Sequence, residues 1–364
     1  MKVLIAGGGT GGHLMPALAL ADAMRTVRRD VEPVLVGAER GIEAAILPQR
    51  ADYPYHLLPV EPIHRRQWWK NARWLRVFWT LRRRCRTILE EERPVFAVGT
   101  GGYAAGPILF LCQRWGIPVA LQEQNAMPGF TTRRLARRAA QIHLGFPEAR
   151  EHLRPGEETE VFDFGNPIVP PPARRPSRAV GKVALGIDDD AKVCFVMGGS
   201  QGARSINQVM STALRRGMLE GVTVLWSTGP SMWDHFAGHH APPHRIVKPF
   251  WDPVAHAYAA ADLVVGRAGA MTTAELSAWG LPAILIPLPT AAADHQSVNA
   301  DALQAAGSAI HVPDSEVTAV SLAGRIRELL DAPQRLAAMS RMALERAHPD
   351  ASMRIATQLL ALAD

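Results

Sequence analysis

This sequence of 364 residues lacks the features that indicate a disulfide-rich, metal-binding, membrane-spanning or secreted protein. Its three cysteines, Cys85, Cys112 and Cys194, show neither metal-ligand spacing nor an even disulfide set. No apolar run reaches the roughly 18–20 residues that span a bilayer. The apolar N-terminus runs straight into glycines, unlike a signal peptide. The sequence therefore predicts a soluble, cytoplasmic, globular protein with room for two domains.

Acidic residues are missing from the stretch in which the positive charge is concentrated. The net charge is +6, and residues 65–86 contain nine Lys or Arg, no acid and four of the nine tryptophans. On a helix from about residue 71, one stripe at helical spacing predicts a core face: Trp74, Phe78, Leu81, Cys85 and Ile88. The remaining basic-aromatic face suits a lipid headgroup interface. The predicted membrane residues are Trp68, Trp69, Trp79, Arg82, Arg83 and Arg86.

Two other interpretations of this basic segment stay open. The first is a solvated basic face with partly buried tryptophans. The second is RNA binding, which is weaker because no nucleic-acid-binding module is recognisable in the sequence. We therefore expect an anionic phospholipid surface as partner, and no nucleic acid.

Short apolar runs alternate with helical patterns along the chain, which predicts parallel sheets covered by helices. Strands are expected first at 3–7, 31–37, 95–99, 118–122 and 141–146, with helices at 17–28, 74–91 and 129–140. A proline-rich, basic stretch at 165–182 then predicts a linker. The strand pattern restarts at 192–200, 222–228, 244–250, 262–267, 282–288 and 308–312.

This organisation predicts an α/β chain with two doubly wound, Rossmann-like domains. They are expected to cover residues 1–164 and 165–344, the second including the linker. Residues 335–362 are expected to be helical. A C-terminal helix at about 345–364 is expected to pack back onto the first domain.

Glycine-rich turns follow four of the expected strands. They are GGGTGG (7–12), GTGGYAAGP (99–107), GGSQGARS (198–205) and GRAGAMTTAE (266–275). Bare backbone lets a phosphate approach closely, and a helix that starts there supplies N–H groups. Because carboxyl ends of parallel strands form the ligand-binding edge of open sheets, four such turns favour a binding cleft.

The first turn satisfies G-x-G-x-x-G, the fingerprint of a dinucleotide fold, but its partner is missing. No acid ends the second strand to bind the ribose, and the nearest one, Glu39, lies beyond it. NAD binding is therefore disfavoured. No G-x-x-x-x-G-K-[ST] motif is present, which excludes a Walker-type NTPase.

The motifs GGGTGGH (7–13), GTGGYAAGP (99–107), EQN (123–125), GNP (165–167), GGSQGARSIN (198–207) and RAGAMTTAELSAWGLPAILIPLP (267–289) resemble those of the MurG family. The resemblance runs in order from residue 3 to about residue 312. It implies a GT-B fold, in which two Rossmann-like domains face each other across a cleft.

The resemblance also implies the activity of the MurG family of bacterial peptidoglycan synthesis. N-acetylglucosamine passes from UDP-GlcNAc to the C4 hydroxyl of the N-acetylmuramyl sugar of lipid I, with inversion, and lipid II is formed. The expected partners are UDP-GlcNAc, lipid I and the membrane. The expected location is peripheral, on the cytoplasmic face of the bacterial plasma membrane. No cofactor and no catalytic metal are expected.

The resemblance assigns roles to residues that match the family motifs. His13 is the expected catalytic residue, either as general base or as a group that orders the acceptor or its diphosphate. The expected acceptor and diphosphate residues are Thr10, Gly11, Gly12, Gly101, Gly102, Tyr103 and Asn125. The expected donor residues are Asn125, Ser200, Gln201, Gly202, Phe250, Trp251, Ala270, Met271, Thr272, Glu275, His295 and Gln296.

Within the donor set, individual roles follow the family. Phe250 and Trp251 fall where backbone reads uracil, and the helix start at Ala270 falls at the diphosphate. Glu275 is expected roughly one and a half turns into that helix, within reach of the ribose hydroxyls. A solvated helix glutamate is its alternative interpretation. His295 and Gln296 fall where the GlcNAc hydroxyls are read.

The sequence departs from the family pattern at three places. Gln122 stands where a histidine often precedes EQN, and Ala268 where a serine is common. The GNP motif continues as Ile168-Val169-Pro170, without the arginine that many members carry. These departures change individual donor contacts that the family pattern implies.

A run of three aspartates, residues 188–190, invites interpretation as a metal site. It precedes a strand, at the end opposite the ligand-binding edge, so a solvated turn is expected. Two other functions stay open from the residues alone. One is a GT-B transferase with a soluble or macrolide-like acceptor. The other is a non-catalytic nucleotide-sugar binder or an NAD-binding scaffold.

Overall fold

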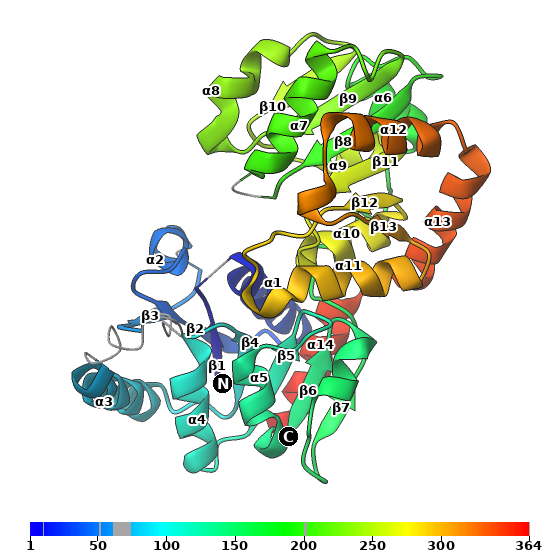
Figure 1. The fold of residues 1–364 in the computed structure, drawn as a ribbon. Helices are drawn as coiled ribbons and strands as arrows, with labels where there is room; N and C mark the ends of the chain where they lie inside the picture. The colour runs from blue at the N-terminus through cyan, green and yellow to red at the C-terminus, as the bar shows by residue number, and fades with distance from the viewer. Residues whose placement is uncertain (10, 51, 61–73, 200–201, 364) are drawn as a thin grey trace. The chain divides into compact units, whose positions relative to one another are not determined.

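The computed structural model describes residues 1–9, 11–50, 52–60, 74–199 and 202–363 (Figure 1). The chain forms two compact units, Met1–Val169 with Asp350–Asp364, and Pro170–Pro349. The second unit therefore starts later than residue 165. Asn166 is buried and bonded to Gln122, which ties this end of the expected linker to the first unit.

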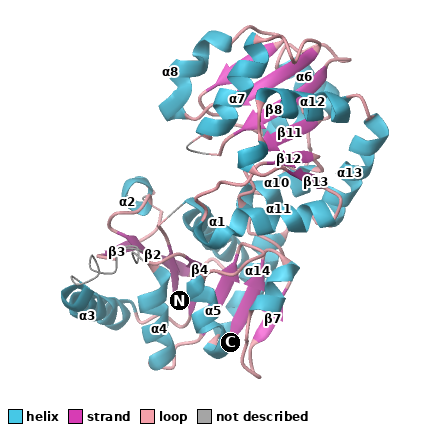
Figure 2. Ribbon diagram, viewed as in Figure 1, coloured by secondary structure: helices cyan, strands magenta, loops and turns pink. Residues whose placement is uncertain are grey.

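The first unit contains a seven-stranded, all-parallel sheet (Figure 2). Its strands, in spatial order, are β3 (Tyr55–Leu58), β2 (Glu32–Ala38), β1 (Lys2–Gly7), β4 (Ala97–Gly101), β5 (Val119–Glu123), β6 (Gln141–Leu144) and β7 (Glu160–Phe162). The central strands are buried on both faces, as their continuous apolar runs predict.

Helices cover both faces of this sheet. One core contains residues of α3 (Trp74–Glu92), α4 (Ala105–Arg114) and α5 (Phe130–Leu135). The core on the other face contains residues of α1 (Gly11–Val27) and α14 (Ala351–Leu360). Since Ile355 and Leu359 of α14 are fully buried there, the end of the chain completes the first unit.

The second unit contains a six-stranded parallel sheet. Its strands, in spatial order, are β10 (Arg245–Lys248), β9 (Val222–Ser227), β8 (Lys192–Met197), β11 (Leu263–Gly266), β12 (Ala283–Leu285) and β13 (Ala309–His311). Its helices are α6 (Arg178–Ala184), α7 (Arg204–Arg215), α8 (Trp233–Phe236), α9 (Ala255–Ala260), α10 (Ala270–Trp279), α11 (His295–Ala305), α12 (Ala319–Leu330) and α13 (Pro333–Glu345). Two Rossmann-like units are thereby confirmed.

Several boundaries differ from the sequence-based expectation. Helix α6 begins at Arg178, inside the stretch expected to be linker, after a Ser177 N-cap. Helix α1 begins at Gly11 rather than at residue 17, although glycine and proline are poor helix formers. The expected helix at 335–362 is two helices, α13 and α14, separated at residues 346–350, where Pro349 cannot continue a helix.

In each sheet, successive strands are added first toward one edge and then toward the other. The change of direction falls between β1 and β4 in the first sheet and between β8 and β11 in the second. Open α/β sheets bind ligands at such switch points, beyond the carboxyl ends of the strands. The four glycine-rich turns follow these four strands. The topology therefore assigns a pair of glycine-rich turns to each unit's expected binding edge.

Candidate active site

The two glycine-rich turns of the first unit are in direct contact. The Gly8 amide donates to the Gly101 carbonyl across 3.4 Å. A Cβ on Gly102 would lie 1.8 Å from the Gly8 carbonyl oxygen, and Gly102 has φ +82°. Only glycine allows this approach. The Tyr103 ring lies against Gly9, so it closes the pair of turns on one side.

His13 lies in the first turn of α1, between these two glycine turns. Its Nδ1 is 3.0 Å from the Thr100 carbonyl oxygen and 3.2 Å from Gln124 Oε1. Because both partners are acceptors, Nδ1 carries the proton of the neutral ring and the lone pair is on Nε2. A Cβ on Gly101 would lie 2.8 Å from Nδ1, so a side chain there would displace the imidazole.

Buried amides hold the partners of His13 in place. Gln124 Nε2 donates to the Thr100 carbonyl at 2.7 Å, which leaves Gln124 Oε1 for His13. Asn166 of the GNP motif donates to the Gln124 carbonyl at 3.0 Å and accepts from Gln122 Nε2 at 3.1 Å. Gln122, a departure from the family pattern, is therefore part of this support.

Asn125 lies two residues after the end of β5 and is partly buried. Its backbone N–H and Nδ2 lie 3.1 Å and 3.4 Å from Glu123 Oε1. The other carboxylate oxygen of Glu123 accepts from the Gly129 amide at 3.0 Å. Glu123 thus sets the orientation of Asn125, which follows directly after a partner of His13.

Glu43, at the start of α2 (Glu43–Ile46), is a fully buried carboxyl group beneath the first glycine turn. Its Oε1 accepts from the Gly9 amide at 2.5 Å. Among the described residues, Oε2 has no hydrogen-bond partner. Burial raises the pKa of this carboxyl above its ordinary value of 4.5. Glu43 therefore holds the turn through an N–H that no ligand can use at the same time.

Glu43→Gln is expected to be at least as stable as the wild type at pH 8, and Glu43→Ala less stable by about 1–3 kcal/mol. The folded chain binds the Glu43 proton more tightly than the unfolded chain, so the penalty for ionisation is absent below pH 4.5 and grows as pH rises through the folded pKa. Glutamine keeps an acceptor for Gly9 without this penalty. Urea unfolding at pH 5 and pH 8 measures both effects.

Glu39→Gln, at an exposed glutamate nearby, is the matched control and should change the free energy of unfolding little at either pH. If Glu43→Gln lost stability relative to the wild type as the pH rose, the raised pKa would be contradicted.

The expected binding edge of the second unit is also built on close glycine approaches. Gly202 has φ +78°, its amide donates to the Gly199 carbonyl at 3.0 Å, and a Cβ there would lie 2.2 Å from the Thr228 carbonyl. After β11, Gly269 caps α10, whose first turn is Ala270, Met271 and Thr272. This helix start is where it was predicted.

Glu275 lies in the second turn of α10 and is partly buried. Its Oε2 accepts a hydrogen bond from the Tyr258 hydroxyl at 3.0 Å. Burial raises the pKa of the Glu275 carboxyl, and the Tyr258 hydrogen bond opposes this shift. Glu275 is therefore held in place, unlike a solvated helix glutamate.

Phe250 and Trp251 follow β10 and differ in exposure. Phe250 is 52% exposed, whereas Trp251 is 5% exposed and packs edge-on against Phe195 at 5.6 Å between ring centroids. The Lys248 ammonium lies 4.4 Å from the centre of the Trp251 ring. The Trp251 Nε1 is buried without a hydrogen-bond partner among the described residues.

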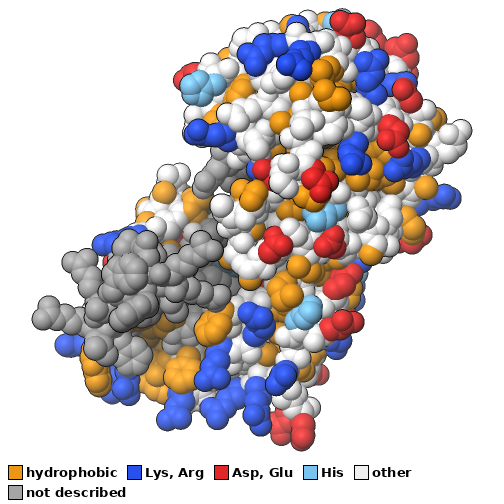
Figure 3. Space-filling model, viewed as in Figure 1, with side chains coloured by type: hydrophobic (Ala, Val, Ile, Leu, Met, Phe, Trp, Pro, Cys, Tyr) orange, Lys and Arg blue, Asp and Glu red, His pale blue; other side chains and the backbone are white. Residues whose placement is uncertain are grey.

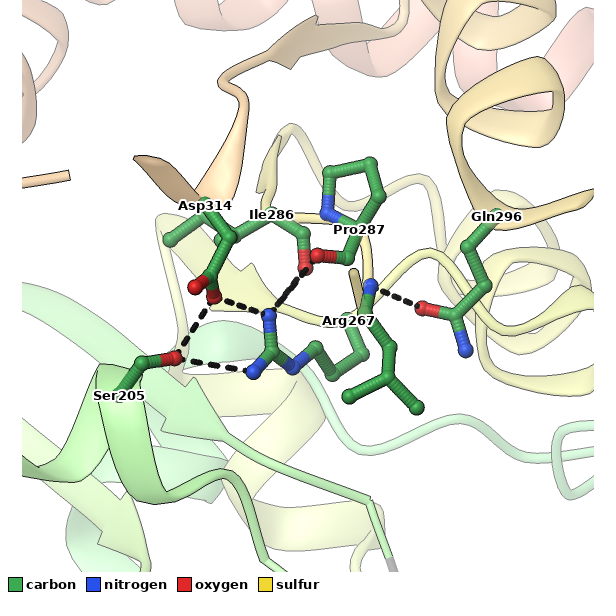
Figure 4. A network of polar contacts seen from close by, with 7 residues as sticks. Ser205, Arg267, Ile286, Pro287, Gln296 and Asp314 are labelled. Atoms are coloured by element: carbon green, nitrogen blue, oxygen red, sulfur yellow. Dashed lines mark hydrogen bonds and ion pairs between the residues drawn. The ribbon is translucent and has the colours of Figure 1, made fainter. Parts of the chain in front are cut away.

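A polar network centred on Arg267 lies at the carboxyl ends of the second sheet's strands (Figure 4). Arg267 Nη1 donates to Asp314 Oδ1 at 2.6 Å and to the carbonyls of Ile286 and Pro287 at 3.1 and 2.9 Å. Its Nη2 donates to Ser205 Oγ at 2.9 Å. Ser205 in turn donates to Asp314 at 2.6 Å. One guanidinium thus joins the segments that follow β8, β11, β12 and β13.

His295 and Gln296 begin α11. His295 Nδ1 is 2.7 Å from the Ala292 carbonyl. Gln296 Oε1 accepts from the Leu288 amide at 2.9 Å, next to the carbonyls held by Arg267 (Figure 4). The Arg267 network therefore supports the loop to which Gln296 is attached.

Asp188, Asp189 and Asp190 lie exposed in the turn before β8. In the part of the chain that the structure describes, no group of three or more His, Cys, Asp or Glu side chains is arranged to hold a metal ion. Five predicted site residues lie outside the described residues: Thr10, Trp68, Trp69, Ser200 and Gln201.

The sequence interpretation missed most of the supporting residues. Gln124, Asn166 and Arg267 stand inside the quoted motifs, so their position was a usable signal, although no role was assigned to them. Glu43 and Tyr258 carry no such signal. Their partners are 34 and 17 residues away in the sequence, and only the fold brings them together.

Comparisons with known proteins identify the family to which the chain belongs. Residues 3–144 match the glycosyltransferase family 28 N-terminal domain, and residues 193–355 match the glycosyltransferase family 28 C-terminal domain. The structure is similar to the crystal structure of MurG from Acinetobacter baumannii, with TM-score 0.78, 25% identity and 99% of each chain covered. It is also similar to a calicheamicin glycosyltransferase, with TM-score 0.66 and 15% identity over 99% of this chain and 98% of that one, a likeness of fold alone.

Curated relatives match this chain over its whole length, and two of them serve as examples. The protein of Salinibacter ruber is 40% identical over all of this chain and 97% of its own length, and that of Chlorobaculum parvum is 39% identical over all of this chain and 99% of its own. Both are named UDP-N-acetylglucosamine–N-acetylmuramyl-(pentapeptide) pyrophosphoryl-undecaprenol N-acetylglucosamine transferase. The chain therefore belongs to glycosyltransferase family 28 and, within it, to the MurG family of N-acetylglucosamine transferases.

Proposed function

We propose that this chain transfers N-acetylglucosamine from UDP-GlcNAc to the C4 hydroxyl of the N-acetylmuramyl sugar of lipid I, which yields lipid II and UDP. The observation that carries the proposal is that, at the switch point of each sheet, one glycine-rich turn leads directly into a helix N-terminus, the arrangement that binds phosphate groups. These helices begin at Gly11 in the first unit and at Ala270 in the second. A transferase whose donor and acceptor both carry a diphosphate needs two such sites.

The chemistry is a single displacement at the anomeric carbon of the donor sugar. His13 Nε2 takes the proton of the acceptor hydroxyl as its oxygen forms a bond to that carbon. The bond from the carbon to the diphosphate oxygen breaks, its electron pair leaves with UDP, and the configuration inverts. The first-turn amides of α10 and the dipole of that helix stabilise the leaving diphosphate.

The experiment that tests this proposal is transfer of labelled GlcNAc from UDP-GlcNAc to a lipid I analogue. We expect turnover with or without excess EDTA, because backbone amides supply the stabilisation that a cation gives elsewhere. Absence of transfer by the folded protein would overturn the function. Loss of transfer in EDTA that Mg²⁺ restores would overturn the metal-independent mechanism.

For membrane association, the supporting surface is formed by α3, α4 and α5, which pack side by side. The predicted core face of α3 is confirmed for Leu81, Cys85 and Ile88, which are buried. Trp79, at 66% exposure, points outward, and the Arg82 guanidinium lies 5.8 Å from its ring centre. The exposed basic and aromatic residues of the three helices and the ends that follow them include Trp79, Arg82, Arg83, Arg86, Phe110, Arg114, Trp115, Phe130, Arg133, Arg134, Arg137 and Arg138.

On the face drawn in Figure 3, Lys and Arg side chains gather near the ends of α4 and α5, with hydrophobic side chains between them. Basic side chains attract anionic lipid headgroups, and exposed aromatic rings insert into the headgroup region of the bilayer. None of the described helices is long and apolar enough to cross a bilayer. These observations support peripheral binding to an anionic membrane on the side that carries lipid I.

Charge reversal at Arg82, Arg83 and Arg86 is expected to reduce binding to anionic vesicles while turnover of a soluble acceptor analogue is retained. Each arginine contributes about 1 kcal/mol near an anionic surface, so the three together weaken partitioning by about two orders of magnitude. Co-sedimentation with phosphatidylglycerol vesicles measures the effect. Reversal of Arg215, Arg216 and Arg341, exposed residues of the second unit, changes the net charge equally and serves as the control.

Equal loss of sedimentation in both triple variants would mean that net charge, and not this surface, determines binding. Unchanged sedimentation of the first variant would remove the membrane role of α3.

A further inference from the structure

Tyr258 places a buried phenol directly behind Glu275. The residue lies in α9, is 2% exposed and donates from its hydroxyl to Glu275 Oε2 at 3.0 Å. The Met197 sulfur, at 3.8 Å, is the other recorded hydrogen-bond contact of this hydroxyl and a weak one. A buried hydroxyl needs a partner, and here the partner is a carboxylate expected to bind substrate.

The surrounding rings leave Tyr258 little freedom. Its ring centre lies 5.9 Å from that of Phe195 on β8 and 5.6 Å from that of Trp279 at the end of α10. Burial and the adjacent Glu275 raise the pKa of Tyr258 well above 10.0, so the phenol keeps its proton and remains the donor. The hydroxyl therefore presents a hydrogen-bond donor at one defined position.

The hydrogen bond from Tyr258 occupies one carboxylate oxygen of Glu275, Oε2, and leaves Oε1 available to a ligand. Oε1 of Glu275 has no hydrogen-bond partner among the described residues, and the side chain is only partly buried. A carboxylate fixed through one oxygen presents the other in a defined direction. A pair of ribose hydroxyls, each a donor, matches such an acceptor.

We propose that Tyr258 is a positioning residue that, by fixing Glu275, makes the second unit prefer ribonucleoside diphosphates over their deoxyribose analogues. The proposal rests on the proposed function, in which Glu275 accepts from the donor ribose. A site built to hydrogen-bond a hydroxyl rejects an analogue that lacks it, because an acceptor covered by the bound nucleotide is then left unpaired. The rejection requires that the acceptor cannot turn away, and Tyr258 prevents that movement.

The test compares the affinities of UDP and of its 2′-deoxy and 3′-deoxy analogues by calorimetry for the wild type and Tyr258→Phe. Phenylalanine keeps the packing against Phe195 and Trp279 and removes the hydroxyl alone. We expect UDP to bind about five- to tenfold more weakly, the deoxy analogue that lacks the recognised hydroxyl to be nearly unaffected, and the preference for ribose to shrink accordingly.

Tyr53→Phe is the matched control. Tyr53 is 5% exposed and also donates from its hydroxyl to a carboxylate, Asp22, but in the first unit. The Tyr53→Phe substitution should leave the affinity for all three nucleotides unchanged. In a Glu275→Ala background, Tyr258→Phe should add no further change in the preference for ribose, because the two residues act through one contact.

The outcomes separate the inference from the function on which it rests. If Tyr258→Phe weakened UDP and both deoxy analogues equally, or left the preference unchanged, Tyr258 would be a packing residue and the inference would be wrong. If Glu275→Ala itself kept the wild-type preference for ribose, the proposed ribose contact of Glu275 would be wrong.

Discussion

Replacing His13 with alanine is expected to lower kcat for GlcNAc transfer by about 10²- to 10⁴-fold, the usual contribution of a general base. The donor is expected to bind almost unchanged, because its predicted contacts lie mainly in the second unit. Steady-state kinetics with a lipid I analogue, combined with calorimetric titration of UDP, measure the two quantities separately.

The hydrogen bonds of His13 supply the physical reason. A base needs a lone pair directed toward its proton, and the two acceptors at Nδ1 place the ring proton on that nitrogen. Thr100 contributes a second constraint, since its hydroxyl donates to the His13 carbonyl at 2.8 Å. The ring is therefore both oriented and held in one tautomer before substrate arrives.

His152→Ala, at an exposed histidine of the same unit, is the control and should leave kcat unchanged. Added imidazole should restore part of the activity of His13→Ala, which an ordering role would not predict. A kcat near the wild-type value, with a raised KM for the acceptor, would assign His13 to acceptor binding instead of proton transfer.

The strands and glycine-rich turns of the expected binding edges could be predicted because they depend on local sequence. A buried parallel strand requires a continuous apolar run, and a close turn requires glycine, so β1, β4, β8 and β11 and the turns after them were all recognisable. Strands β3 and β7 were not predicted. Both lie at sheet edges, are only four and three residues long and contain few fully buried positions, so their apolar pattern is weak.

The residues that orient the site could not be predicted in the same way, because their partners are distant in the sequence. His13 meets Gln124 across 111 positions, and Arg267 meets Asp314 across 47. Sequence spacing says which residues share a helix face or a strand end, but not which side chain approaches from the neighbouring strand. The motifs therefore predicted the candidate site residues, while the residues that support them became visible only in the fold.

Replacing Arg267 with alanine is expected to lower the free energy of unfolding by about 3 kcal/mol, the lower end of the cost of removing one partner of a buried ion pair, because this pair is largely buried. The Arg267 and Asp314 side chains are 12% and 19% exposed. Without the guanidinium, the carbonyls of Ile286 and Pro287 lose this donor, and Asp314 keeps the Ser205 hydroxyl but loses its charged partner. Urea unfolding followed by tryptophan fluorescence measures the loss.

Arg335→Ala is the matched control, because Arg335 also forms a 2.6 Å ion pair, with Glu328, but both side chains are about half exposed, at 47% and 62%. Solvent screens such a pair, so the expected loss is below about 1 kcal/mol. Similar losses in the two variants would show that burial does not strengthen the Arg267 network. Lysine at position 267 should restore little, since an ammonium group cannot reproduce the planar fork that meets several acceptors at once.

A functional effect should accompany the loss of stability. Arg267 holds the carbonyls of Ile286 and Pro287, and the next residue, Leu288, donates to Gln296. Since Gln296 is expected to read the GlcNAc hydroxyls, Arg267→Lys should weaken UDP-GlcNAc binding more than UDP binding. If the affinities for both ligands fell equally, the network would support nucleotide binding and not recognition of the sugar. If both affinities were unchanged, Arg267 would contribute to stability alone.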